Sequence, residues 1–183
     1  MAQITTKSGD KGMTQVAPDA MAPKSSVVLD VMGNIDELSC ILGLCGDRFD
    51  AIQSFLSELM GYIYYKNNNE SRVSGQVALM EDYILSHNNS IPTWFVNPKG
   101  FVSLARSVCR RAERSVVRMN NELRESGKID DYNLYPVMKY LNRLSDYLFV
   151  KSFEHEAQMP ELFPDELAVT EGKLAVASGD TRS

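Results

Sequence analysis

The chain has 183 residues, which is enough for one domain with a hydrophobic core of its own. A hydrophobic share of 44% and a charged share of 23% are typical of a globular protein and argue against wholesale disorder. The net charge of -5 argues against a nucleic-acid-binding protein that is held by bulk electrostatics.

The cysteines and the apolar runs indicate the cellular compartment to expect. Cys40, Cys45 and Cys109 are odd in number and form no CxxC pair, so we expect neither a disulfide framework nor a zinc site. The first ten residues contain no apolar signal core, and no run reaches the 18 or so apolar residues of a membrane span. We therefore expect a cytoplasmic protein with no membrane partner.

Residues 1–25 are punctuated by glycine and proline and are predicted to form an irregular loop. Such a loop exposes backbone N–H groups, and its hydroxyls and lysines suit a phosphate ligand. It lacks the GxxxxGK[ST] arrangement of a Walker A loop, so an ordinary surface loop is the alternative.

Hydrophobic periodicity predicts five helices after this loop, and hence an all-α fold. The expected ranges are 26–45, 49–65, 76–86, a fourth helix that includes 104–118 and ends near Ser126, and a fifth at about 133–157. The polar run 66–75 is expected to be a loop. Residues 1–158 are predicted to form a single domain, and 159–183 an acidic, poorly ordered tail.

The fourth predicted helix carries an excess of arginine. Arg106, Arg110 and Arg114 are four residues apart and share one face, with Arg111 and Arg118 on its flank. The opposite stripe is predicted to face the core; it comprises Leu104, Val108, Ala112, Val116, Met119 and Leu123. The basic face is either solvated or opposed by an anion. Asp36 and Glu37, in the middle of the first helix, are either solvent-facing or the partners that these arginines lack.

Two further features leave a structural and a functional interpretation open. Asn142 and Asp146 lie four residues apart beside the core stripe of the fifth helix, where they could bind a ligand or join a polar network. Trp94 and Phe95 lie in an irregular stretch, where they could close the end of a bundle or form an apolar wall for a large flat ligand.

Four motifs in this order resemble the PduO-type ATP:cob(I)alamin adenosyltransferases. They are TKSGDKGMT at 6–14, GNIDELS at 33–39, ARSVCRRAER at 105–114 and YLNRLSDYLF at 140–149. The resemblance implies a five-helix bundle with ferritin-like up-down packing that assembles as a homotrimer with active sites between subunits. It implies transfer of the 5′-deoxyadenosyl group of ATP to cob(I)alamin, with Mg²⁺ on the phosphates, and a possible hand-over of the product to a cobalamin-dependent enzyme.

Site residues follow from the resemblance by position. Asp36 and Arg106 are expected to pair across the subunit interface, and Phe95 to lie beside the corrin, which makes these three the catalytic candidates. The residues expected to bind ATP are Thr6, Lys7, Ser8, Gly9, Thr14, Gln15, Lys24, Arg106, Arg110, Arg111, Glu113, Arg114 and Asn142. The metal ligands stay unassigned.

Departures from the family pattern leave other functions open. The chain has NPKG at 97–100 where the family usually has LPGG, a shorter approach to Arg106, and Ser39 in place of asparagine. One alternative is a non-catalytic trimeric protein that carries ATP or cobalamin. Another is a trimeric bundle in which Asp36 and the arginines serve only as interface salt bridges.

Overall fold

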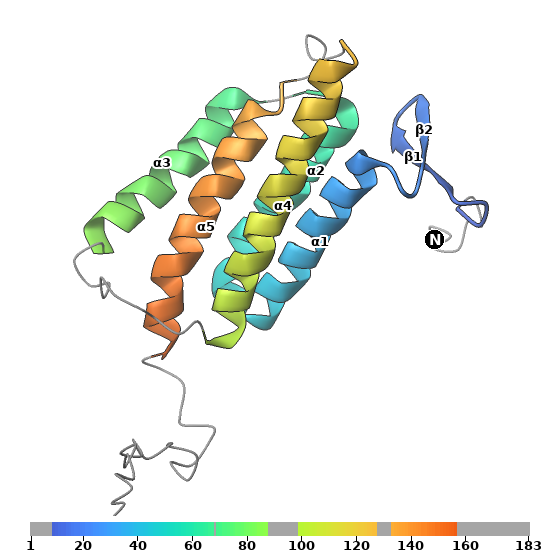
Figure 1. Cartoon of the computed structure of the whole chain (residues 1–183). Helices are drawn as coiled ribbons and strands as arrows, with labels where there is room; N and C mark the ends of the chain where they lie inside the picture. Colours follow the sequence, from blue (N-terminus) through green and yellow to red (C-terminus); the bar gives the residue numbers. More distant parts are fainter. Residues whose placement is uncertain (1–8, 68, 88–98, 128–132, 157–183) are drawn as a thin grey trace, which may run out of the picture.

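A computed structural model describes residues 9–67, 69–87, 99–127 and 133–156. Five α-helices lie side by side in this part of the chain (Figure 1). They are α1 Val27–Leu44, α2 Asp50–Tyr65, α3 Glu70–His87, α4 Gly100–Glu125 and α5 Tyr135–Glu156. The all-α prediction is confirmed. No helix among the described residues is long and apolar enough to cross a membrane.

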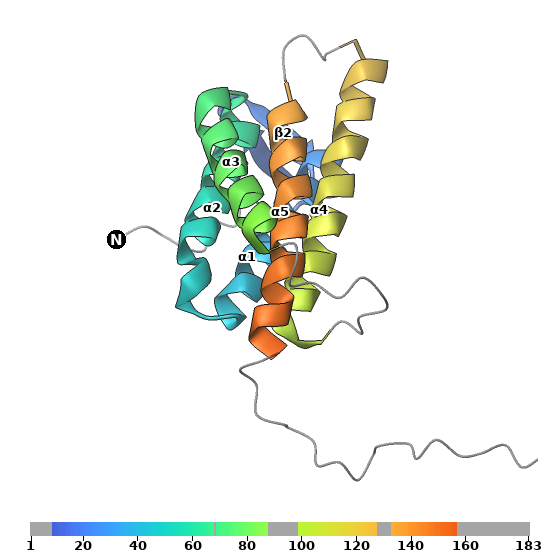
Figure 2. The ribbon, with the colours of Figure 1, turned by 90° about the vertical axis from the view of Figure 1, so that its left-hand side faces the viewer.

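The helices pack in the order α3, α5, α4 and α1, with α2 behind α1 (Figures 1 and 2). Each helix buries most of the stripe that its periodicity predicts, and the predicted inward residues of α5, which are Val137, Leu141, Leu144, Leu148 and Ser152, are all buried. The Phe55 and Tyr140 rings meet with centroids 4.7 Å apart, which links α2 to α5. Removing these apolar surfaces from water is the main stabilising term for the bundle.

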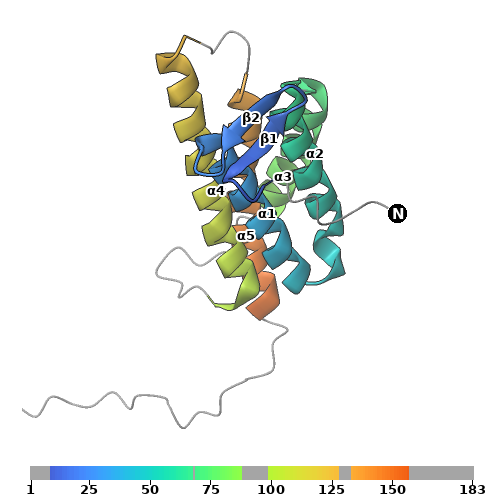
Figure 3. The ribbon, with the colours of Figure 1, turned by 90° about the vertical axis from the view of Figure 1, so that its right-hand side faces the viewer.

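The N-terminal segment differs from the expected irregular loop. Strands β1 Met13–Ala17 and β2 Ala20–Pro23 form an antiparallel hairpin that lies beside α1 and α2 (Figure 3). Exposure alternates along β1 and ends at the buried Ala17, the period-2 pattern of a half-covered strand. The strands are short, and Gly9, Gly12, Pro18 and Asp19 lie just outside them, so the composition of the segment predicted a loop.

The predicted loop 66–75 is wrong over most of its length, because α3 begins at Glu70. The Asn69 side chain accepts a hydrogen bond of 3.1 Å from the backbone N–H of Arg72, as an N-cap residue does. Val73 is buried one turn before Val77, so the core stripe of the helix also starts earlier than predicted. The polar surface of this first turn masked the helical pattern.

Helix α4 is longer than the arginine motif and is rotated slightly from the expected face. Leu104 was predicted to face the core but is 47% exposed, whereas Val102 and Ala105 are buried. The helix ends as predicted: Gly127 has a φ of +69°, a conformation that glycine adopts without steric cost, and its N–H donates to the Arg124 carbonyl. The residue range of the tail, 159–183, lies outside the described part of the chain.

The three cysteines are free and occupy different environments. Cys40 is exposed, whereas burial raises the pKa of both Cys45 and Cys109.

We expect iodoacetamide to alkylate Cys40 first in the native protein, and Cys45 and Cys109 at least about tenfold more slowly, because the thiolate is the reactive form and the buried thiols require local opening. Peptide mass spectrometry over time measures the three rates, and unfolded protein is the control. Fast alkylation of Cys109 in native protein would contradict the packing of α4.

Candidate functional site

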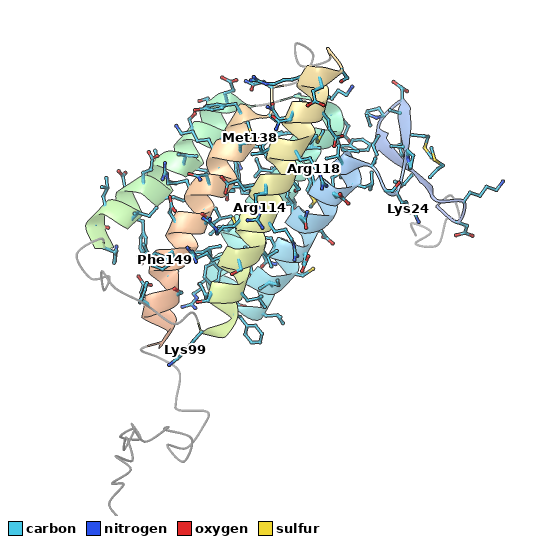
Figure 4. All side chains as sticks on the ribbon, in the orientation of Figure 1. Lys24, Lys99, Arg114, Arg118, Met138 and Phe149 are labelled. Atoms are coloured by element: carbon cyan, nitrogen blue, oxygen red, sulfur yellow. The ribbon has the colours of Figure 1, made fainter. Side chains whose placement is uncertain are left out.

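Helix α4 separates an apolar face from a basic one. Val108, Ala112 and Val116 are at most 4% exposed and pack between α1 and α5. Arg110 and Arg114 point the other way and are exposed, and Figure 4 shows Arg114 and Arg118 along the outward side of the helix. The apolar stripe therefore fixes the direction in which the arginines project.

Helix α1 supplies counter-charges to two of these arginines. The Nε of Arg111 donates to the Asn34 Oδ1 at 3.0 Å, and its guanidinium also pairs with the Glu37 carboxylate. Arg118, about two turns further along α4, pairs with Asp30. Part of the arginine excess is thus neutralised within the chain, so Arg111, predicted to bind ATP, has a structural contact.

Arg110 and Arg114 differ from Arg111, because neither makes a hydrogen bond or an ion pair with another described residue. Both line a hollow of about 620 Å³ that lies mainly along α4 and reaches Asn142 on α5. Its lining residues are Arg110, Glu113, Arg114, Val117, Arg118, Asn121, Glu122, Glu125 and Asn142. The structure thus brings together four residues that were predicted to bind ATP.

Glu113 and Asn142 join the two helices that form this hollow. The Nδ2 of Asn142 donates to the Glu113 Oε1 at 3.0 Å. Because its amide N–H₂ faces Glu113, Asn142 keeps its Oδ1 available as an acceptor. The hollow therefore offers guanidinium donors for an anion and at least one oriented acceptor.

A second hollow of about 380 Å³ lies on the other side of α4, against α1. It is lined by Asp30, Asn34, Arg111, Arg114, Ser115 and Arg118. Arg114 and Arg118 line both hollows, so the two hollows meet at these arginines. We call the row of arginines on the outer face of α4 the basic crest. In this second hollow Asn34 contacts Arg111 and Asp30 contacts Arg118. Arg114 is the arginine of this hollow that has no hydrogen bond or ion pair with a described residue.

The catalytic candidates do not meet within the chain. The guanidinium of Arg106 lies 4.8 Å from the ring centroid of Phe149, in a cation–π contact, and Phe149 packs edge-on against Phe153. Asp36 is exposed on α1 and makes no hydrogen bond or ion pair with the described residues. Phe95 lies outside the described residues, as do Thr6, Lys7 and Ser8.

The remaining predicted ATP-binding residues belong to the hairpin region. Lys24 follows β2, and a Cβ added at Gly9 would lie 2.8 Å from its Nζ, so glycine allows this lysine to lie across the backbone. The Gln15 side chain donates to the Pro18 carbonyl at 2.7 Å. Figure 4 shows Lys24 well separated from Arg114, and no described hairpin residue lines either hollow.

The sequence interpretation missed several lining residues. Val117, Asn121, Glu122 and Glu125 follow Arg114 and Arg118 at spacings of three and four, and they extend the hollow towards the end of α4. Helical periodicity alone would have placed them on the same face as the arginines. Among the described residues, no group of three or more His, Cys, Asp or Glu side chains could hold a metal ion.

Arg110 and Arg111 are adjacent but have different expected roles. Arg111→Ala removes the ion pair with Glu37 that joins α4 to α1. The two side chains are 46% and 49% exposed, so we expect the free energy of unfolding to fall by about 0.2–1 kcal/mol and the melting temperature by up to about 4 °C. Arg110→Ala removes no such tie, so the melting temperature should not change. Thermal unfolding followed by circular dichroism compares the two, and an equal effect of both variants would contradict this division.

Comparisons with known proteins identify the family of this chain. A model of the family described as cobalamin adenosyltransferase matches residues 4–154. The chain is 30% identical over 166 residues to the cobalamin adenosyltransferase of Cupriavidus metallidurans, a match that covers 82% of this chain and 86% of the relative. It is 30% identical over 173 residues to the corrinoid adenosyltransferase MMAB of Mus musculus, covering 80% of this chain and 70% of the relative.

A solved structure has the same fold. It is a variant PduO-type ATP:corrinoid adenosyltransferase from Lactobacillus reuteri, complexed with cobalamin and ATP, which aligns with a TM-score of 0.62 at 24% identity over 86% of this chain and 94% of that chain. The resemblance that the four motifs indicate is therefore confirmed. The chain belongs to the PduO-type cobalamin adenosyltransferase family.

Proposed function

We propose that this protein transfers the 5′-deoxyadenosyl group of ATP to the cobalt of cob(I)alamin, giving adenosylcobalamin and triphosphate. Family membership supports the reaction class. The observation that carries the proposal is the hollow beside α4, where Arg110 and Arg114 form no hydrogen bond or ion pair with a described residue. Guanidinium groups without an ion-pair partner suit a polyphosphate, because their planar forks donate to phosphate oxygens in pairs.

The reaction requires little proton transfer by the protein. Co(I) is the nucleophile: its electron pair forms the bond to C5′, the C5′–O bond breaks, and triphosphate leaves with the electrons of that bond. The protein has to align cobalt with C5′ and stabilise the charge of the leaving group. Arg110 and Arg114 are suited to the second task, and Asn142, held by Glu113, to orienting the nucleotide.

We further propose that each active site lies between two copies of the chain in a homotrimer. The hairpin group around Lys24 and the arginine group around Arg114 are apart in one chain, as Figure 4 shows, so one ATP would contact both only if they came from neighbouring copies. In this arrangement Asp36 of one copy pairs with Arg106 of the next. Thr6, Lys7 and Ser8 would join the hairpin group, and Phe95 would lie on the corrin side.

Mg²⁺ would be held by the triphosphate rather than by a protein cage. The described residues provide no cluster of carboxylates for it, and Mg²⁺ commonly binds through substrate phosphates and water. The three free cysteines support a reducing compartment such as the cytoplasm. Hand-over of the product to a cobalamin-dependent enzyme is a further part of the proposal.

The central test is formation of the cobalt–carbon bond. Protein, ATP, Mg²⁺ and chemically reduced cobalamin are mixed without oxygen, and the absorbance spectrum of adenosylcobalamin is followed. We expect turnover by the wild-type protein. Arg110→Ala should weaken ATP affinity roughly 10- to 150-fold, because a charge-assisted contact contributes about 1.5–3 kcal/mol.

Arg124→Ala is the matched control, since this exposed arginine lies on the same helix outside both hollows. Its ATP affinity should equal that of the wild type. Tight ATP binding without any adenosylcobalamin would favour the non-catalytic carrier. If ATP does not bind saturably, the arginines serve only as interface salt bridges.

The intersubunit pair predicts an effect of Asp36 on assembly. Asp36→Asn should weaken the trimer or its activity by about 2 kcal/mol or more, because Arg106 would lose the partner that neutralises it at a desolvated interface. Sedimentation over a range of protein concentrations measures the assembly. Asp82→Asn, an exposed aspartate on α3 with no hydrogen bond or ion pair to a described residue, is the control. An Asp36→Asn protein that stays trimeric and fully active would refute the pairing.

A further inference from the structure

The second hollow, between α1 and α4, takes no part in the proposed adenosyl transfer. It has a volume of about 380 Å³. A water molecule occupies about 30 Å³ in the liquid, so the hollow has room for a small hydrated ion. Of the six described residues that line it, three are the arginines Arg111, Arg114 and Arg118, and Asp30 is the one carboxylate.

The two hollows differ in their balance of charge. The first hollow, which reaches Asn142, has three arginines and three glutamates in its lining, so the formal charges of its described residues cancel. The second hollow has three arginines against Asp30 alone. It keeps one positive charge in excess even when Glu37, which pairs with Arg111 from outside the lining, is counted. An excess of positive charge in a concave surface favours an anion.

The side-chain amides of the two hollows have opposite orientations. In the first hollow, Asn142 donates through its Nδ2 to Glu113 and keeps its Oδ1 as an acceptor. In the second, the Asn34 Oδ1 accepts a hydrogen bond of 3.0 Å from the Nε of Arg111, so the Asn34 N–H₂ group is left as a donor. The first hollow therefore offers donors and acceptors, as the hydroxyl and amino groups of a nucleotide require, whereas the second offers mainly donors.

The arginines of the second hollow keep N–H groups that no described residue accepts. A guanidinium has five such donors. Arg111 donates through Nε and Nη2 to two residues of α1, and Arg118 donates through Nη2 to one. These contacts hold both guanidinium groups in place and so order their remaining donors before a ligand arrives. Arg114 makes no such contact, and Figure 4 shows it with Arg118 along the outward side of α4.

We propose that the second hollow binds a phosphate-class dianion, either inorganic phosphate or the end of a free polyphosphate, and that its occupation weakens nucleotide binding in the first hollow. The coupling follows from Arg114 and Arg118, which line both hollows. A guanidinium that turns towards an anion on one side withdraws donors from the other, and two anions so close together repel each other. The effect on the nucleotide rests on the proposed function, whereas the anion site itself does not.

The first test measures phosphate binding without turnover. Inorganic phosphate is titrated into the full-length protein by calorimetry at constant ionic strength, because salt screens exposed charges. We expect saturable binding. Asn34→Ala removes the amide donor and should weaken phosphate binding roughly tenfold, as the loss of a hydrogen bond to a charged ligand does, with ATP affinity in the absence of phosphate unchanged.

Asp30→Asn tests the same site by a gain of binding. It removes the carboxylate from the lining and nearly keeps the shape of the side chain. Phosphate should then bind at least about fivefold more tightly, the factor that one like charge about 4 Å away contributes even in water. Asp82→Asn is the matched control, because it removes the same charge from an exposed position on α3 and should leave phosphate affinity unchanged. Since misfolding does not produce a gain of binding, this pair decides the question if Asn34→Ala folds poorly.

Titration of tripolyphosphate distinguishes the two sources of the anion. If the site accepts single phosphates only, Asp30→Asn and Asn34→Ala change the affinity for inorganic phosphate and not that for tripolyphosphate. If the end of a polyphosphate also enters it, the two variants change both affinities in the same direction. Either pattern supports the anion site.

ATP titrations at increasing concentrations of inorganic phosphate measure the coupling. The apparent dissociation constant of ATP should rise about fivefold to tenfold and then level off, because the two ligands occupy different hollows and both remain bound at saturation. A rise without a limit would mean that phosphate and ATP compete for one hollow. A constant ATP affinity would mean that the hollows are independent, and either result overturns the inference.

Failure of the inference and failure of the proposed function give different results. If wild-type protein binds no phosphate, or if Asp30→Asn and Asn34→Ala bind it as the wild type does, the second hollow is not an anion site, and the proposed adenosyl transfer stands. An equal gain in Asp30→Asn and Asp82→Asn would reduce the effect to net charge and also overturn the site. A protein that binds phosphate as expected but neither binds ATP nor forms adenosylcobalamin overturns the proposed function and leaves the anion site in place, without its effect on the nucleotide.

Discussion

The close packing of α4 between α1 and α5 is the constraint on which the rest of the structure depends. Ala105, Cys109 and Ala112 are completely buried on the inner face of α4, and small side chains at these positions allow the neighbouring helices to approach. The Cys109 thiol donates to the Leu141 carbonyl at 3.2 Å, which shows how near α4 and α5 lie. A larger residue at any of these positions would rotate or displace α4, and with it every arginine on its outer face.

The charges on that outer face fall into two classes. Arg111 and Arg118 are paired with α1 and help to hold the helix in its rotation. Arg110 and Arg114 remain unpaired among the described residues and face the hollow that reaches Asn142. The arginines of α4 therefore fall into one group that is paired with α1 and one that has no ion pair with a described residue, and the second group is the one that we propose binds the nucleotide.

Periodicity predicted the five helices and most of their buried residues, because each helix has an apolar face. It failed where a local polar contact decides the structure: α3 starts at Glu70 because Asn69 caps it, and short strands precede α1. The motif resemblance predicted a site at Arg110, Glu113, Arg114 and Asn142, and the fold places these four residues around one hollow. It could not distinguish Arg111 from Arg110, because the Asn34 contact of Arg111 spans 77 residues of sequence and exists only in the folded chain.

The basic crest of α4 belongs to a protein with a net charge of -5, and this contrast limits how far its attraction extends. At physiological ionic strength, charges are screened over about 8 Å. At long range the net negative charge of the protein repels a polyanion, and the guanidinium groups attract it only near the hollow. In the proposed function, capture would therefore be a short-range event that favours a compact polyphosphate over long anionic polymers, whose charges would extend beyond the hollow.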